Sequence, residues 1–263
     1  MRFGIEIEFT NTSNTLRDIA AKVNSEVIAS GYNDSGCTYA GYTHAVHSGW
    51  KIVTDASLPR GGGELVSPIL EGDNGMMQLK VASEALIAIG CTVNLQCGVH
   101  VHHDATNLNV NDIKNVLKLY IKFEKAIDLI MPLSRRNGRS RWCATNNIKN
   151  DVSETFKGID AESSIRGLAQ SFFGSRRYYN VNLMAYLAHG TIEFRQHGGT
   201  LEFEKIEAWV LLTKAIMTRA IAAKNIQPNT TDAFETLMRV ASKNGAKAVT
   251  KFFRKRRAHF EAA

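Results

Sequence analysis

The segment Phe3-Gly4-Ile5-Glu6-Ile7-Glu8-Phe9 alternates large apolar residues with charged or small ones along its whole length. A period of two predicts a β-strand, because successive side chains of a strand point to opposite faces. The apolar residues then share one face, while Glu6 and Glu8 share the other, about 7 Å apart. Two interpretations of this pair are open: the polar face of a surface strand, or one wall of a functional site.

The same alternation occurs in two later segments that carry titratable residues. Residues 97–104 place His100, His102 and Asp104 on one face, and residues 191–197 place Glu193, Arg195 and His197 on one face. A short strand after a run of glycines begins with Glu64.

These polar faces lack lysine at the positions that carry the carboxylates and imidazoles, whereas a merely solvated sheet normally carries Lys, Thr and Gln. If the strands pair in one sheet, the carboxylates converge and their mutual repulsion requires cations. Sites rich in oxygen ligands with few imidazoles favour Mg²⁺ or Mn²⁺ over a structural zinc ion.

Hydrophobic periodicity and breaker residues predict strands alternating with helices, which indicates an α+β protein. The predicted strands cover residues 2–9, 50–55, 64–67, 97–104, 178–186 and 190–197. The predicted helices cover residues 14–31, 75–90, 111–131, 162–173, 202–224 and 231–244, and a basic helix ends the chain. Because no internal repeat or linker appears, we expect one domain over residues 1–263.

Composition excludes several classes of protein. Hydrophobic residues make up 44% of the 263 residues, which is enough for a full core. The four cysteines show neither metal-ligand spacing nor a disulfide framework, so we expect buried thiols in a reducing compartment. No apolar run reaches the roughly 20 residues that cross a bilayer, and no secretory signal follows Met1. We therefore expect a cytoplasmic protein.

The net charge of +7 is concentrated in two regions. The first, residues 134–178, is expected to be a basic lid whose arginines meet phosphates, or else a solvated insertion, and it contains Arg135, Arg136, Arg139, Arg141, Arg166, Arg176 and Arg177. The second is a helical basic C-terminal segment at 231–263. We favour the solvated face of a last helix there over a nucleic-acid or membrane surface.

Six motifs follow one another in a fixed order over residues 1–215. They are G-I-E-I-E-F at 4–9, W-x-x-x-x-D-x-S-L at 50–58, E-L-V-S-P at 64–68, C-G-x-H-V-H-x-D at 97–104, Y-x-x-N at 179–182 and T-I-E-F-R-x-H at 191–197. Each motif alone is weak, but the ordered set resembles the amidoligase family of the carboxylate–amine ligase superfamily, which includes glutamine synthetase and glutamate–cysteine ligase.

The resemblance implies a curved antiparallel sheet with helices packed on its outer face, and a site that binds ATP and two or three Mg²⁺ (or Mn²⁺) ions. It implies metal ligands at Glu6, Glu8, Glu64, His102 and Glu193. His100 is a second histidine ligand or a nucleotide contact, and Arg195 contacts the transferred phosphoryl group or the activated carboxylate. The remaining ATP- or substrate-binding residues that it implies are Ser57, Tyr179 and Asn182, to which the basic segment adds Arg176 and Arg177.

The activity implied is ATP-dependent amide formation between a carboxylate and an amine through an acyl phosphate, with Asp55 or Glu64 as the base that accepts the amine proton. The substrates are open between small molecules, peptides and proteins, and the reach of the family suggests a bacterial or phage source. Two alternatives remain: a metal-dependent hydrolase or nuclease, and a non-catalytic module that binds nucleic acid or a protein through the basic surface.

Overall fold

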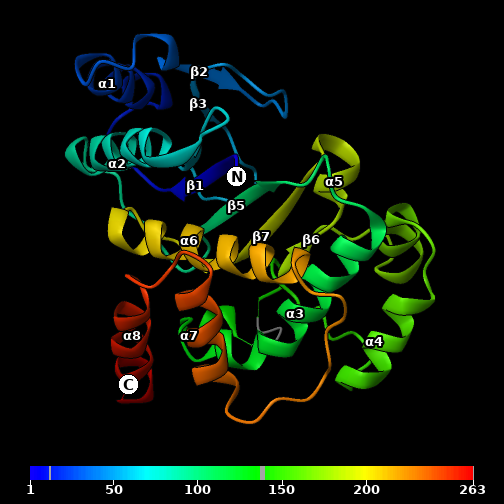
Figure 1. Ribbon diagram of the computed structural model, residues 1–263. Helices are drawn as coiled ribbons and strands as arrows, with labels where there is room; N and C mark the ends of the chain where they lie inside the picture. The colour runs from blue at the N-terminus through cyan, green and yellow to red at the C-terminus, as the bar shows by residue number, and fades with distance from the viewer. Residues whose placement is uncertain (12, 137–139, 263) are drawn as a thin grey trace. The chain divides into compact units, whose positions relative to one another are not determined.

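The computed structural model describes residues 1–11, 13–136 and 140–262 (Figure 1). It is an α+β protein with one open, mixed seven-stranded sheet in the order β2-β3-β4-β1-β5-β7-β6. The strands are β1 (Phe3–Phe9), β2 (Cys37–Gly41), β3 (Trp50–Val53), β4 (Gly63–Val66), β5 (Gly98–Asp104), β6 (Val181–Asn182) and β7 (Thr191–Gly198).

The α-helices are α1 (Leu16–Ala29), α2 (Gly72–Ala88), α3 (Val110–Asp128), α4 (Val152–Ala161), α5 (Met184–His189), α6 (Phe203–Ile221), α7 (Ala233–Lys243) and α8 (Thr250–Ala262). Two short 3₁₀ turns, η1 (Asn33–Ser35) and η2 (Leu133–Arg135), and one π-helix, η3 (Gly167–Phe172), complete the set of described helices.

The α+β class is confirmed, and the sheet is mixed rather than purely antiparallel, because β2 and β3 pair in parallel. Strands β1, β3, β4, β5 and β7 lie where the alternation predicts them. Helices α1, α2, α3, α6, α7 and α8 likewise coincide with predicted helices to within a few residues.

The predicted strand at 178–186 is wrong beyond two residues. Only Val181 and Asn182 pair with β7, and the chain then turns into α5. The Asn182 side chain accepts a hydrogen bond from the backbone N–H of Met184 (2.8 Å), which satisfies a donor at the start of that helix. Strand β2 and helix α4 were not predicted, and the helix predicted at 162–173 is shorter than expected and contains the π-helix η3.

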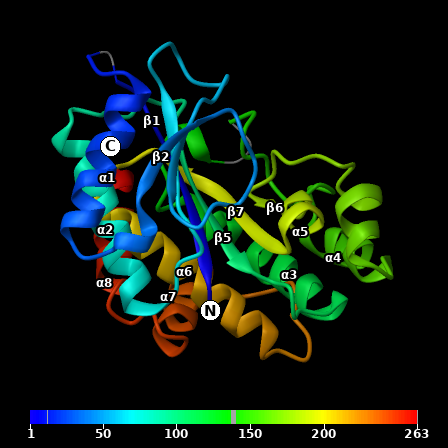
Figure 2. The same cartoon turned by 90° about the horizontal axis from the view of Figure 1, so that it is seen from above.

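The chain divides into two compact units. The first comprises Met1–His102 and His197–Glu207, and α1 packs there against α2, β2 and β3 (Figures 1 and 2). The apolar face of β1 supplies much of its core, with Ile5, Ile7 and Phe9 almost fully buried. In the ladder, Ile7 pairs with Leu65, and Leu65 pairs with Ile52, so an apolar row crosses three strands.

The second unit comprises His103–Gln196 and Ala208–Ala263, and in it α3 packs against α4 and α7. Helix α3 is buried along most of its length and begins at Asn109, whose side chain accepts hydrogen bonds from the backbone N–H groups of Asn111 and Asp112. Within the described part of the chain, every helix is too short or too polar to cross a lipid bilayer.

The four cysteines are buried free thiols, as predicted. Burial raises the pKa of Cys37 to about 12 and that of Cys91 to about 11. These two thiols are therefore protonated and poorly nucleophilic near neutral pH.

Candidate metal and nucleotide site

The polar face of the first unit brings two carboxylates directly opposite each other. In the antiparallel ladder of β1 and β4, Glu8 pairs with Glu64, so their side chains lie side by side on the same face. Two like charges in this position repel each other and destabilise the sheet unless a cation lies between them. Holding the two carboxylates side by side therefore lowers the stability of the fold, and a bound ion would remove this loss.

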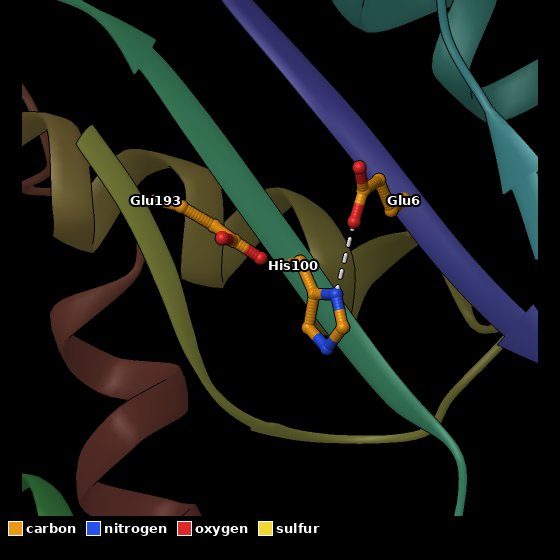
Figure 3. A group of neighbouring side chains, drawn as sticks. All are labelled: Glu6, His100 and Glu193. Carbon is orange, nitrogen blue, oxygen red and sulfur yellow. Dashed lines mark hydrogen bonds and ion pairs between the residues drawn. The ribbon is translucent and has the colours of Figure 1, made fainter. Parts of the chain in front are cut away.

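His100 of β5 connects the two carboxylates of β1. Its Nδ1 lies 3.0 Å from Glu6 Oε2, and its Nε2 lies 3.8 Å from Glu8 Oε1. Figure 3 draws the hydrogen bond between Glu6 and His100 and also labels Glu193, which belongs to the second unit and is described below. His102, two residues further along β5, places its Nε2 3.4 Å from Glu6 Oε1. Both imidazoles therefore face the carboxylates of β1.

Glu8, Glu64 and His100 each offer one ligand atom, and these atoms lie within 4.8 Å of one another. Two carboxylate oxygens and one imidazole nitrogen suit a hard divalent ion such as Mg²⁺ or Mn²⁺ that completes its coordination with water or phosphate oxygens. The residues present therefore fit the metal that the sequence predicts.

Hydrogen bonding fixes Glu8 in position, since its Oε2 accepts a hydrogen bond from the backbone N–H of Gly98 (2.5 Å). The Glu8 side chain is only 8% exposed, whereas that of Glu6 is 27% exposed. The site thus has a buried end at Glu8 and an open end at Glu6.

The pKa of Glu6 responds to the imidazoles beside it. Burial alone would raise this pKa, but attraction to His102 and hydrogen bonds to His100 and His102 outweigh it and hold the pKa well below its usual value. Glu6 is therefore ionised across the neutral range, as a metal ligand must be.

Lys51 is a charged residue of this face that sequence reasoning missed. It pairs with Val66 across β3 and β4, and Val66 pairs with Glu6 across β4 and β1, so Lys51 and Glu6 lie on the same face of the sheet. The run Trp50–Val53 is buried at all four positions, so its sequence does not show which face each residue takes.

In the second unit, Glu193 of β7 lies at the centre of a buried polar group. Its Oε2 accepts a hydrogen bond from Asn182 Nδ2 (2.5 Å), and its Oε1 forms an ion pair with Arg195. Asn182 and Glu193 are direct partners in the ladder of β6 and β7. The two motifs that carry these residues, Y-x-x-N and T-I-E-F-R-x-H, therefore meet in one sheet.

Arg195 is held in a fixed orientation by an aromatic group. Its guanidinium lies 5.9 Å from the centre of the Tyr178 ring, and its Nε is 3.5 Å from the carbonyl oxygen of Trp142. Tyr178 packs edge to face against Trp142, and Arg177 lies over Tyr178. This cluster presents a guanidinium and aromatic rings, which suit a planar or anionic ligand.

The other predicted site residues have local roles in the structure. Tyr179 packs against Phe173 and lies beneath the exposed Arg176. Asp55 and Ser57 form a tight turn after β3, in which Asp55 Oδ1 accepts a hydrogen bond from the backbone N–H of Ser57 (2.6 Å). A contact of these residues with a substrate stays a prediction.

The described part of the basic segment 134–178 contains α4 and η3. Arg135 is only 2% exposed, and Arg136 donates a hydrogen bond to the carbonyl oxygen of Met131 (2.7 Å). Arg141, Arg166 and Arg177 are exposed, and Arg139 lies outside the described residues. The role of segment 134–178 as a lid stays a prediction.

The arginines of α8 serve the packing of the last helices. Arg256 donates a hydrogen bond to the carbonyl oxygen of Ile130 (2.6 Å), and Arg254 makes a two-pronged ion pair with Glu235 of α7. Phe253 of the same helix, α8, is buried. Part of the basic surface of this segment is therefore engaged within the second unit.

A family model described as "Putative amidoligase enzyme" matches residues 1–217. The match contains all six ordered motifs and ends within α6, before α7 and α8. A search of curated proteins finds no match to the chain. Since the model covers most of the sequence and every strand that carries a carboxylate or histidine of the candidate site, this chain belongs to the amidoligase family.

Proposed function

We propose that this protein is an ATP- and Mg²⁺-dependent ligase that joins a carboxylate to an amine as an amide. The family description supports a ligase, and the observation that carries the metal requirement is the convergence of Glu8, Glu64 and His100. ATP and the divalent ion are parts of the proposal.

We propose Glu6, Glu8 and Glu64 as carboxylate ligands of the metal. His100 is favoured as the imidazole ligand because its ring lies with Glu8 and Glu64, and His102 orients Glu6 or serves as a further ligand. When bound, the ion would neutralise phosphate charge during phosphoryl transfer.

Glu193 is proposed as a further metal ligand, on the strength of the family resemblance and of its buried carboxylate. Asn182 and Arg195 both hold this carboxylate, so its orientation is fixed before a ligand arrives. Asn182 therefore acts on the site as a positioning residue.

The proposed reaction has two steps. A carboxylate oxygen of the acid attacks the γ-phosphorus of ATP, the bond to the β-phosphate oxygen breaks, and ADP leaves. The amine then attacks the carbonyl carbon of the acyl phosphate, inorganic phosphate leaves with the carbon–oxygen bond pair, and a base takes the proton from nitrogen. One ATP is consumed for each amide formed.

Arg195 is proposed to stabilise the negative charge of the phosphoryl oxygens. A guanidinium held by Glu193 and an aromatic ring cannot lose its charge and needs little reorganisation to receive an oxyanion. Arg176 and Arg177 are exposed and suit the distal phosphates or an anionic substrate.

Ser57 and Tyr179 are proposed as substrate contacts, and Asp55 or Glu64 as the base that accepts the amine proton. Glu64 serves in this role only if it is free of the metal, which makes Asp55 the simpler candidate. Asp55→Asn tests the simpler candidate, because loss of the base should flatten the acidic limb of the rate profile and leave Mn²⁺ binding unchanged. Glu64→Gln, in contrast, should weaken Mn²⁺ binding as well.

The test is ATP-dependent phosphate release by the purified protein with Mg²⁺, screened over pairs of carboxylic acids and amines. We expect one class of pair to stimulate release above the rate with either partner alone. The proposal fails if no pair stimulates release and if Glu6→Gln and Glu193→Gln leave nucleotide binding unchanged.

A further inference from the structure

Lys51 has an unusual environment for a lysine in a sheet. It is 4% exposed, and its ammonium group donates a hydrogen bond to the carbonyl oxygen of Ala45 (2.6 Å), with the carbonyl oxygen of Thr43 at 3.5 Å. Both acceptors belong to the loop between β2 and β3. Neither contact is an ion pair. Because a buried charge needs an opposite charge near it, the negative charge that stabilises this ammonium must come from elsewhere.

That origin is the carboxylate face of the same sheet. Desolvation lowers the pKa of Lys51, and the negative charges of Glu6 and Glu64 oppose this shift. The register gives the same result independently, because Lys51, Val66 and Glu6 follow one another across three neighbouring strands on one face. The ammonium thus interacts with the negative charges of both carboxylates at a distance, without a direct ion pair to either of them.

We infer that Lys51 is a built-in counter-ion that limits the charge of the metal site. This inference rests on the proposed function, and it assigns Lys51 as a positioning residue that sets how strongly the carboxylates of Glu6, Glu8 and Glu64 attract divalent ions. Three carboxylates and one ammonium carry a net charge of minus two, which one divalent ion neutralises. Without the ammonium, a formal charge of minus one would remain after that ion had bound.

The position of Lys51 also couples the site to the loop of residues 42–49. The carbonyl groups of this loop hold the ammonium, and its exposed face carries Tyr42, whose hydroxyl is hydrogen-bonded to His44 (2.9 Å), and Val46. The loop and the carboxylate face are therefore linked through one side chain, that of Lys51.

The inference is tested by Mn²⁺ titration of the wild-type protein, Lys51→Gln and Lys51→Met, followed by electron paramagnetic resonance. Gln keeps an N–H donor for the loop carbonyls, Met keeps the length of the side chain, and both remove the charge. We expect both variants to bind Mn²⁺ about fivefold more tightly than wild type or better, because each removes the repulsion between the divalent ion and a single positive charge about 8 Å away. The dielectric constant of water sets the lower limit, and the burial of Lys51 enlarges the effect. Lys51→Arg keeps the charge and is expected to bind as wild type does.

Equal or weaker Mn²⁺ binding by the folded Lys51→Gln protein would overturn the inference, because a lysine with a structural role alone can only weaken the site when it is lost. Absence of Mn²⁺ binding by the wild-type protein would overturn the proposed metal site and the inference with it. If neither neutral variant folds, the test relies on the Lys51→Arg protein. Arginine keeps the positive charge but has a different arrangement of donors, so the inference requires its Mn²⁺ affinity to stay within twofold of wild type, and a larger change would overturn it.

Discussion

Two buried carboxylate clusters of this protein have opposite surroundings. Glu124 of α3 is surrounded by donors: the Thr145 hydroxyl, the backbone N–H of Asn146 (2.9 Å) and the Asn180 amide (2.6 Å). On the sheet face of the first unit, by contrast, Glu8 accepts a hydrogen bond from the backbone N–H of Gly98 but lies opposite another carboxylate, Glu64, and beside an imidazole.

The comparison shows that burial alone does not indicate a metal site. A carboxylate whose oxygens already accept several hydrogen bonds does not need a cation to balance its burial, and it stabilises the fold without a bound metal. A carboxylate held opposite a like charge makes the apo protein less stable, and a divalent ion bound by both carboxylates would relieve that repulsion. We therefore expect Glu124 to matter for folding, and Glu8 and Glu64 to matter for binding.

The largest effect is expected from Glu124→Ala. The change leaves the Thr145, Asn146 and Asn180 donors without their acceptor and opens a cavity, so the free energy of unfolding should fall by about 3–5 kcal/mol. Urea unfolding in EDTA measures it. The matched change Glu64→Ala removes a repulsion and should cost less than about 1 kcal/mol in the same buffer. If Glu64→Ala is the more damaging of the two, the contrast between the clusters is wrong.

The next effect concerns metal binding by Glu64→Gln. Loss of a ligand charge should weaken Mn²⁺ binding by about 100-fold, as measured by titration of the apo protein. Glu124→Gln is the matched control, because its amide oxygen still accepts from Asn146 and Asn180 and its amide nitrogen can donate to the Thr145 hydroxyl. Equal loss of affinity in both variants would mean that the effect comes from burial and not from ligation.

The pKa values of Glu6 and Glu124 should depart from the usual value in opposite directions. Attraction to His102 and hydrogen bonds to both imidazoles lower the pKa of Glu6 despite burial, whereas burial, aided by nearby Asp128, raises the pKa of Glu124 despite its hydrogen bonds. Carboxyl ¹³C shifts of glutamate-labelled apo protein, assigned with Glu6→Gln and Glu124→Gln, measure both.

The two shifts also have opposite signs in stability. The contribution of Glu6 is present above its unfolded-state pKa and is lost as the pH falls through its lowered native pKa. The contribution of Glu124 is present below its unfolded-state pKa and is lost as the pH rises through its raised native pKa. Titration of both residues on the same side of the usual value would contradict this account of their surroundings.

The smallest effect is expected at an exposed carboxylate. Glu235 of α7 is paired with Arg254 of α8 near the surface, and the hydrogen bond from Arg254 lowers the pKa of Glu235. Because water and salt screen such a pair, Glu235→Gln should move the thermal midpoint far less than Glu124→Ala and should leave Mn²⁺ binding unchanged. A large loss of stability here would show that α8 depends on this ion pair more than on the buried Phe253.

Most of the fold follows from local patterns in the sequence. Strand β1 alternates apolar residues with charged or small ones along its whole length, and α1 begins at Thr15 with a reciprocal capping box to Asp18, so each of these elements can be predicted from its own sequence. Strand β2 was missed because its five residues have no alternation, and only its pairing with β3 makes it a strand.

Residues 178–186 were misread for a related reason. Their apolar and aromatic content suits a strand, but the Asn182 side chain turns the chain into α5, and Gly190 ends that helix in a left-handed conformation (φ 69°). Such capping contacts depend on side-chain geometry that composition does not show.

The candidate site, like the fold, could be predicted from the sequence only in part. Alternation predicts which face Glu6, Glu8, His100 and His102 share, but pairing register decides that Glu8 meets Glu64 and that Lys51 joins their face. Register depends on contacts between segments that lie far apart in the sequence, so it cannot be predicted from the sequence of one segment.

The central claim, that a carboxylate is activated by ATP at this site, is tested most directly by following ¹⁸O. The protein is incubated with ATP, Mg²⁺, a pool of carboxylic acids labelled with ¹⁸O in the carboxylate, and a pool of amines, and the inorganic phosphate is analysed by mass spectrometry. We predict that phosphate carries ¹⁸O from the acid in wild type and Glu124→Gln, and that Glu64→Gln forms almost none. Phosphate without ¹⁸O, whose fourth oxygen then comes from water, or equal labelling by Glu64→Gln, would contradict the account.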